Sequence, residues 1–129
     1  MDDLFGQYLQ DAAPAVEHGK PRLEVRTGPE DGRVFPIVTE TVIIGRQLAG
    51  TESSAGGPSL SHFVIRSDKA ISREHCELTS LSSATFLLKD LDSRFGTELN
   101  GVRITAPTPC GPGDTITIGD TTLMLQCEP

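Results

Sequence analysis

Residues 97–104 read Thr-Glu-Leu-Asn-Gly-Val-Arg-Ile, with Asn100-Gly101 between two short runs of strand-forming residues. Asn and Gly both tolerate a positive φ, which the type I′ turn of a two-residue hairpin requires. The stretch therefore predicts two antiparallel strands, Thr97–Leu99 and Val102–Ile104, joined by a tight turn.

The same β pattern extends to both sides of this hairpin. Turn-forming residues such as Gly28–Gly32 and Gly119-Asp120 separate short runs rich in β-branched and apolar residues. Pro36 places its strand at a sheet edge or a bulge. The predicted strands are Arg22–Arg26, Val34–Val38, Thr41–Ile44, Phe63–Ile65, His75–Thr79, Thr85–Lys89, Thr97–Leu99, Val102–Ile104, Thr115–Ile118 and Thr121–Gln126. The fold class is therefore all-β, a sandwich of about ten to eleven short strands.

Several segments fall outside this strand pattern. Residues 1–20 are expected to form a tail, disordered or a short helix, which ends in the linker Gly19-Lys20-Pro21. Residues 21–129 are expected to form a single domain. Gln47–Ser61, rich in Gly, Ser and Ala, predicts a long flexible loop, and Pro107–Gly113 predicts another loop.

Charge and cysteine content narrow the functional classes. The chain carries 18 acidic and 11 basic residues and a net charge of −7, so it lacks the basic footprint of a nucleic-acid binder. It contains no apolar run of membrane length, and its three cysteines show no metal-ligand spacing. We therefore expect an intracellular protein without cofactor, metal, direct nucleic-acid contact or membrane contact.

Enzyme signatures are missing from the sequence. No nucleophile elbow, phosphate-binding loop, zinc-protease motif or dinucleotide fingerprint occurs. Ser72 lies three residues before His75, which is the one candidate for a nucleophile and its base, but no acid that would orient the base is identifiable. We expect no enzymatic activity.

Polar and cationic residues gather in four blocks at predicted strand ends. The blocks are Val42–Arg46, Ala70–His75, Leu91–Thr97 and Asn100-Gly101. Loops at the end of a rigid sandwich are where such folds build binding sites. The candidate side chains in these blocks are Arg46, Ser72, Arg73 and Arg94. Guanidinium groups and a hydroxyl suit a doubly charged phosphate with three acceptor oxygens.

In this order the blocks resemble the forkhead-associated (FHA) family, whose pattern is Gly-Arg, Ser-Arg-x-His, Ser-x-Asn-Gly-Thr and Asn-Gly. The resemblance covers about residues 22–127 and includes Gly113-Asp114 as the closing block. It implies an FHA-type sandwich with a phosphopeptide site on loops at one end. It also implies an adaptor that binds phosphothreonine in a partner protein. The sequence does not determine the oligomeric state, and we take a monomeric domain as the default.

The resemblance implies a role for each matching position. Arg46 would clamp the phosphate, and Ser72 would donate a hydrogen bond to it. Gly45 and His75 would support the site without touching the ligand. The full set of implied phosphopeptide-binding positions is Arg46, Ser72, Arg73, Arg94, Phe95, Gly96, Thr97 and Asn100.

Phe95 departs from the family pattern, because it stands where the family has an Asn that holds the peptide main chain. Of two roles for Phe95, packing beneath its loop and contacting the peptide, we slightly favour the first. Residues 93–97 and 67–75 are most similar to the nibrin branch of the family. That similarity implies a nuclear scaffold of the DNA-damage response or of another signalling pathway. The departure leaves open an alternative, a structural or phospho-independent interaction domain of the same fold.

Overall fold

The structure is a computed structural model that describes residues 20–47, 60–82 and 84–128. These residues form eleven strands: β1 (Lys20–Thr27), β2 (Val34–Pro36), β3 (Thr41–Gly45), β4 (Leu60–Val64), β5 (Cys76–Ser80), β6 (Phe86–Asp90), β7 (Thr97–Leu99), β8 (Val102–Arg103), β9 (Thr108–Cys110), β10 (Thr115–Ile118) and β11 (Thr121–Glu128). The all-β prediction is confirmed. None of the described residues forms a helix with the length and apolar character needed to cross a membrane.

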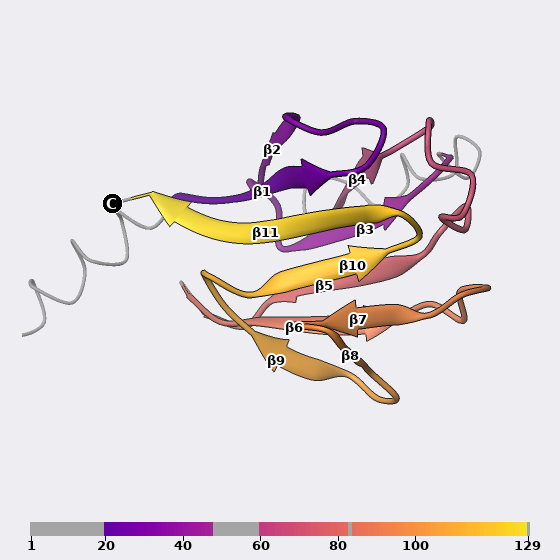
Figure 1. The fold of residues 1–129 in the computed structure, drawn as a ribbon. Coiled ribbons are helices and arrows are strands. Elements are labelled where there is room, and N and C mark those ends of the chain that lie inside the picture. The colour runs from indigo at the N-terminus through magenta and orange to yellow at the C-terminus, as the bar shows by residue number, and fades with distance from the viewer. Residues whose placement is uncertain (1–19, 48–59, 83, 129) are drawn as a thin grey trace, which may run out of the picture.

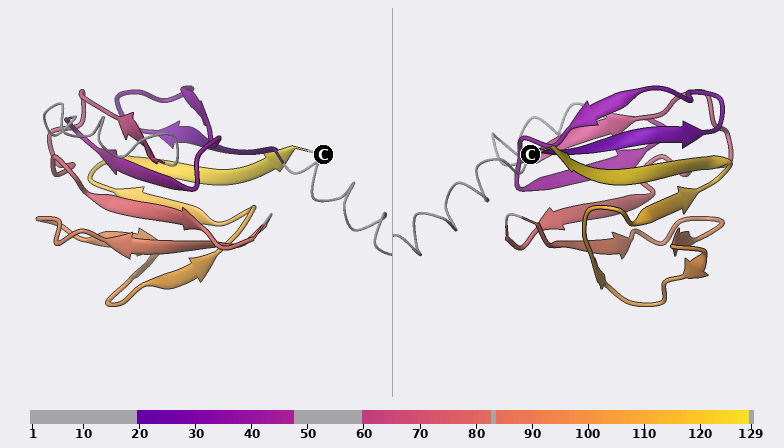
Figure 2. Two further views of the ribbon diagram at one scale, coloured as in Figure 1. Left: turned by 180° about the vertical axis from the view of Figure 1, so that it is seen from behind. Right: turned by 60° about the vertical axis from the view of Figure 1, so that its left-hand side comes forward.

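The strands form two sheets that pack face to face (Figures 1 and 2). One sheet has the order β2-β1-β11-β10-β7-β8, and the other has the order β4-β3-β5-β6-β9. In β10, and in β11 as far as Leu125, every second side chain is buried, as the period of a strand with one face on a core requires. The largest fully buried side chains are Phe63, Phe86, Leu23, Ile44, Ile65, Ile71, Leu78, Leu88, Ile116, Ile118, Leu123 and Leu125. Each such side chain stabilises the fold by about 1.5–3 kcal/mol.

The two ends of the described chain lie side by side (Figure 1). β1 pairs antiparallel with β11, from Lys20 opposite Glu128 to Thr27 opposite Thr122, with a bulge between Val25 and Thr27. β3 pairs parallel with β4 and antiparallel with β5. The long β1–β11 ladder therefore joins the first and the last strand of the domain within one sheet.

Strand positions follow the sequence closely, with one omission. β7 and β10 have the predicted bounds, and φ values of 53° at Asn100 and 85° at Gly101 fit the predicted turn. The prediction of a loop over Pro107–Gly113 is wrong, because β9 lies there and pairs with β6. This strand was not predicted because it contains Pro109. A residue without an N–H is tolerated there, since β9 lies at the edge of its sheet.

The expected flanking segments are only partly within the described residues. Residues 1–19 of the predicted tail and residues 48–59 of the predicted loop lie outside them. Lys20 and Pro21 belong to β1, so the linker predicted there is wrong. Leu60 and Ser61 belong to β4, which starts earlier than predicted. Pro36 lies in β2, an edge strand as expected.

Four connections meet at one end of the sandwich, on the right of Figure 1. They are the residues after β3, the β4–β5 loop, the β6–β7 loop and the β10–β11 turn. Three of the four sequence blocks lie on these connections. The fold therefore brings together side chains that are far apart in the chain.

Candidate functional site

Gly45 lets the end of β3 approach the β4–β5 loop closely. A Cβ on Gly45 would lie 1.8 Å from the Arg73 carbonyl oxygen, so no larger residue fits. The Arg46 N–H donates to the Ser72 carbonyl (2.9 Å), and Arg46 Nε donates to the Ile71 carbonyl (2.9 Å). These bonds fix the guanidinium beside Ser72. The two Nη groups of Arg46 donate to no residue in the described part of the chain.

Ser72 is held through both its main chain and its side chain. Its N–H donates to His75 Nδ1 (3.0 Å), and its Oγ accepts the N–H of Arg94 (2.9 Å). Because the hydroxyl oxygen already accepts, the hydroxyl hydrogen is available to a second acceptor. A ligand oxygen beside Arg46 would be such an acceptor.

His75 joins the two loops from inside the protein. The ring is fully buried, Nδ1 accepts from Ser72, and Nε2 therefore carries the hydrogen that is donated to the Gly96 carbonyl (2.7 Å). Burial lowers the pKa of His75, although the bond to Gly96 and the charges of Asp90 and Asp68 act in the opposite direction. The ring is therefore a neutral spacer between the two loops.

Asp90 fixes the β6–β7 loop. Its Oδ1 accepts the hydroxyls of Ser93 (2.5 Å) and Thr97 (2.6 Å), and its Oδ2 accepts the Ser93 N–H (3.1 Å). Ser93 Oγ in turn accepts the Gly96 N–H (2.9 Å). Burial alone would raise the pKa of Asp90, but the bonds from Ser93 and Thr97 lower it on balance. The charged carboxylate thus organises the loop that carries Arg94 and Phe95.

Asp68 fixes the β4–β5 loop in the same way. Its side chain is buried and accepts the N–H groups of Ala70 (3.0 Å) and Asp120 (2.8 Å) and the hydroxyl of Thr121 (2.6 Å). These bonds tie the loop that carries Ser72 to the β10–β11 turn. Sequence reasoning missed both Asp68 and Asp90. The available signal was an Asp two or three residues before the amide that it binds, as in an Asx turn.

Arg73 and Arg94 are exposed on these loops, and Arg46 is partly buried between them. Within residues 20–47, 60–82 and 84–128, no carboxylate forms an ion pair with any of the three. Their positive charge is therefore not neutralised by the described part of the protein. Such a cluster can attract a multiply charged anion.

Two predicted positions support the framework. Thr97 is buried and donates to Asp90, so it acts from beneath the loop. Asn100 donates to Asp114 Oδ1 (3.0 Å) and accepts the Thr115 N–H (2.9 Å). Because Thr97 pairs with Ile118 and Leu99 with Ile116, Asn100 lies at the other end of β7 from Gly96. The structure therefore does not bring Asn100 to Arg46.

Phe95 does not pack beneath its loop, and that expectation is wrong. Its side chain is 58% exposed, and the Arg94 guanidinium carbon lies 5.2 Å from the ring centroid. The hydrogen bonds that hold the loop are made by Asp90, Ser93 and Gly96 and do not involve the Phe95 side chain. The ring is therefore left on the surface next to the cationic cluster.

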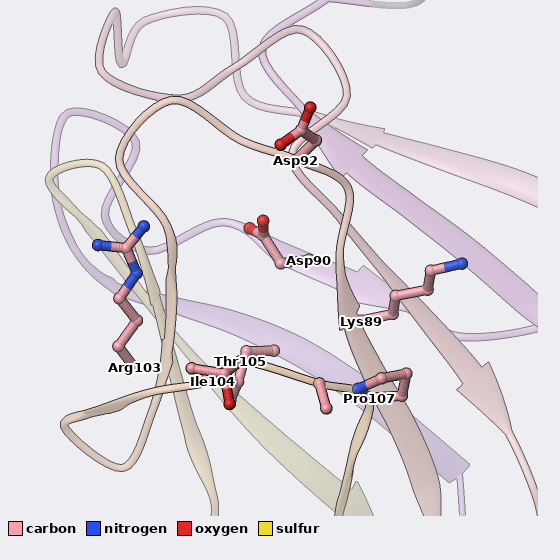
Figure 3. A pocket seen from close by; sticks show the side chains of 8 residues that line it. Lys89, Asp90, Asp92, Arg103, Ile104, Thr105 and Pro107 are labelled. Atoms are coloured by element: carbon pink, nitrogen blue, oxygen red, sulfur yellow. The ribbon is translucent and has the colours of Figure 1, made fainter.

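A cavity of about 540 Å³ lies between the end of β6, the start of the β6–β7 loop and the segment after β8 (Figure 3). It is lined by Lys89, Asp90, Asp92, Arg103, Ile104, Thr105, Ala106 and Pro107. Arg103 Nε lies 2.6 Å from where a Cβ on Gly96 would be, so Arg103 covers the back of the loop. The cluster of Arg46 and Ser72 does not line this cavity. No group of three potential metal ligands occurs among the described residues.

The FHA domain model matches residues 42–119, more than half of the 129 residues. The chain belongs to the FHA family. FHA domains are protein-interaction modules that bind phosphothreonine, and the family is not enzymatic. No curated protein matches the chain in sequence.

Solved FHA domains share the fold. The FHA domain of an Arabidopsis thaliana hypothetical protein is 26% identical, with a TM-score of 0.69 over 86% of this chain and 87% of that chain. An FHA domain from a study of phosphothreonine-dependent FHA interactions is 24% identical, with a TM-score of 0.66 over 85% and 98%. The S. pombe Nbs1 FHA-BRCT1-BRCT2 structure is 22% identical, with a TM-score of 0.63 over 82% and 36%. These similarities confirm the FHA-type β-sandwich.

Gly45→Ala should lower the free energy of unfolding by about 3 kcal/mol, because the methyl group would displace the Arg73 backbone. Gly32→Ala is the matched control. It introduces a Cβ at a φ of 99° with no atom within 4 Å, so only backbone strain of about 1–2 kcal/mol is expected. Urea unfolding of both variants measures the difference. Equal losses would contradict the close approach.

Stability should fall as the pH drops below 6.5, the ordinary pKa of His75. The unfolded chain then takes up a proton that the folded state does not bind until the pH reaches the lowered pKa. The carboxylates with lowered pKa values, such as Asp90, lose their contribution only at more acidic pH. Urea unfolding between pH 7.5 and 5.5 measures the slope. A His75 pKa of 6.5 or above in an NMR titration would contradict the neutral spacer.

Proposed function

We propose that this FHA domain is a non-enzymatic adaptor that binds phosphothreonine in partner proteins, with the phosphate held by Arg46 and Ser72. The observation that carries this proposal is their juxtaposition. The Arg46 N–H donates to the Ser72 carbonyl (2.9 Å). Among the described residues, none accepts a hydrogen bond from the Arg46 Nη groups or from the Ser72 hydroxyl, so these donors can serve a ligand. Charge-assisted hydrogen bonds from such groups are the strongest that a phosphate can receive.

The charges around this pair favour the doubly ionised phosphate. Arg73, Arg94 and Lys69 are exposed on the same two loops, and Glu74 and Asp92 are the exposed acids there. The cations outnumber the acids, so acidic residues beside the phosphothreonine would strengthen binding. Because the loops are already hydrogen-bonded, little backbone change is needed on binding.

Several similar structures contain peptide or protein partners. They include an FhaA FHA domain with the intracellular domain of Rv3910, EmbR with a low-affinity phosphopeptide, and an engineered FHA domain with a Myc-pTBD peptide. These partners belong to those proteins. They support a phosphopeptide as the ligand class for this chain as well. A preference for threonine over serine is the family expectation.

We further propose that the domain is of the nibrin type and acts in the nucleus in a DNA-damage-response scaffold. The support is the sequence of residues 93–97 and 67–75, with an aromatic residue at position 95. Recruitment of the tagged protein to nuclear sites of DNA damage, lost in Arg46→Ala, is the expected result. Cytoplasmic localisation that persists after damage would contradict it.

Calorimetric titration of phosphothreonine, phosphoserine and unphosphorylated versions of a peptide pool tests the phosphate site. We expect modest affinity for the phosphothreonine pool, since a short peptide buries little area, and no binding of the unphosphorylated pool. Arg46→Ala should weaken binding by about 30-fold, because charge-assisted hydrogen bonds are lost. Arg26→Ala, which removes an exposed arginine paired with Glu24, is the control.

Equal binding of all three pools would favour the alternative, a phospho-independent interaction domain. The exposed Phe95 is the feature that keeps this alternative open. Hydrolysis of a generic ester that Ser72→Ala abolishes would instead indicate an enzyme. Hydrolysis is not expected, because the described neighbours of Ser72 and His75 provide no acid hydrogen-bonded to the ring.

A further inference from the structure

Phe95 is an exposed aromatic side chain within a well-ordered network. The other phenylalanines among the described residues are buried or half-buried, and Phe35 and Phe63 stack with their centroids 4.5 Å apart. Phe95 is 58% exposed, and one face of its ring lies against the Arg94 guanidinium. Because the ring contributes little to the core, we consider a role in binding a partner rather than in stabilising the fold.

The backbone around Phe95 is fixed on both sides. The Arg94 N–H donates to Ser72 Oγ (2.9 Å), the Gly96 N–H donates to Ser93 Oγ (2.9 Å), and the Gly96 carbonyl accepts from His75 (2.7 Å). An aromatic ring on a fixed backbone loses little conformational entropy when it binds a partner. Such rings dominate the binding energy of many protein interfaces.

Phe95 also lies close to the proposed phosphate site. Consecutive Cα atoms are about 3.8 Å apart, and the Arg94 nitrogen lies 2.9 Å from Ser72 Oγ, so the Phe95 Cα is within about 8 Å of that hydroxyl. An extended peptide advances about 3.5 Å per residue. The ring is therefore within reach of peptide residues up to three positions from a phosphothreonine held at Ser72.

We propose that Phe95 binds an aliphatic side chain of the partner that lies within three residues of the phosphothreonine. This inference rests on the proposed function, since the phosphate sets the position of the peptide. The polar groups of Arg46 and Ser72 supply the dependence on phosphate, and the ring supplies sequence preference. An aliphatic group suits the ring because Arg94 already occupies one face as its cation.

A purely internal role for the ring makes a different prediction. If Phe95 only held Arg94 beside the phosphate, its removal would weaken every phosphopeptide by the same factor. If it binds a peptide side chain, its removal would affect only peptides that carry that side chain. The coupling between Phe95 and a peptide position separates the two roles.

The test uses a phosphothreonine peptide with alanine at the three positions on each side, and six peptides in which one alanine is replaced by leucine. We expect at least one leucine peptide to bind the full chain about three- to tenfold more tightly than the alanine peptide. Phe95→Ala should abolish this gain and leave affinity for the alanine peptide within about twofold. Val102→Ala, which shortens an exposed apolar side chain on β8, is the matched control and should retain the gain.

Three outcomes would overturn the inference while leaving the proposed function intact: no leucine position tightens binding, the gain persists in Phe95→Ala, or Phe95→Ala weakens all seven peptides equally. Loss of stability does not confuse the result, because exposed side chains contribute little to folding and urea unfolding of the variant verifies this. Absence of any phosphate-dependent binding by the wild-type chain would reject the proposed function, and the inference with it.

Discussion

The buried ring of His75 is the interaction on which the site depends. It accepts the Ser72 N–H at one nitrogen and donates to the Gly96 carbonyl at the other, so the β4–β5 and β6–β7 loops have a fixed separation. Only the neutral tautomer with hydrogen on Nε2 satisfies both bonds. Protonation would place an N–H on Nδ1 opposite the Ser72 N–H. Burial, which disfavours the charged ring, therefore also preserves the geometry of the site.

Negative charge inside the site and positive charge outside it have separate roles. Asp68 and Asp90 are satisfied by N–H and hydroxyl groups of the loops that they position, and neither forms an ion pair with an arginine of the site. Had these carboxylates paired with Arg46 or Arg94, an incoming phosphate would have to displace them. Neutral donors keep the loops rigid and leave the guanidinium groups available.

Strand positions were predictable because they depend on local patterns, while several side-chain environments depend on contacts between distant segments. The Asn100-Gly101 turn fixed the bounds of β7 locally, whereas β9 contains Pro109 and exists only because β6 provides a partner. The proximity of Arg46 and Ser72 could be predicted, because the four sequence blocks occur in the order of the family pattern. Asp68 was missed because its carboxylate accepts the N–H of Asp120, which lies in a turn 52 residues away in the sequence.

The exposure of Phe95 follows from the same distinction between backbone and side chain. The conformation of the β6–β7 loop is set by Ser93, Gly96 and Asp90, none of which bonds to the side chain at position 95. The fold therefore places no demand on the residue there, and an aromatic ring is accommodated as readily as an amide. What the substitution changes is the surface offered to a ligand, from hydrogen-bonding groups to an apolar face backed by a cation. Dependence on phosphate and preference for sequence can thus be set by different residues of the same two loops.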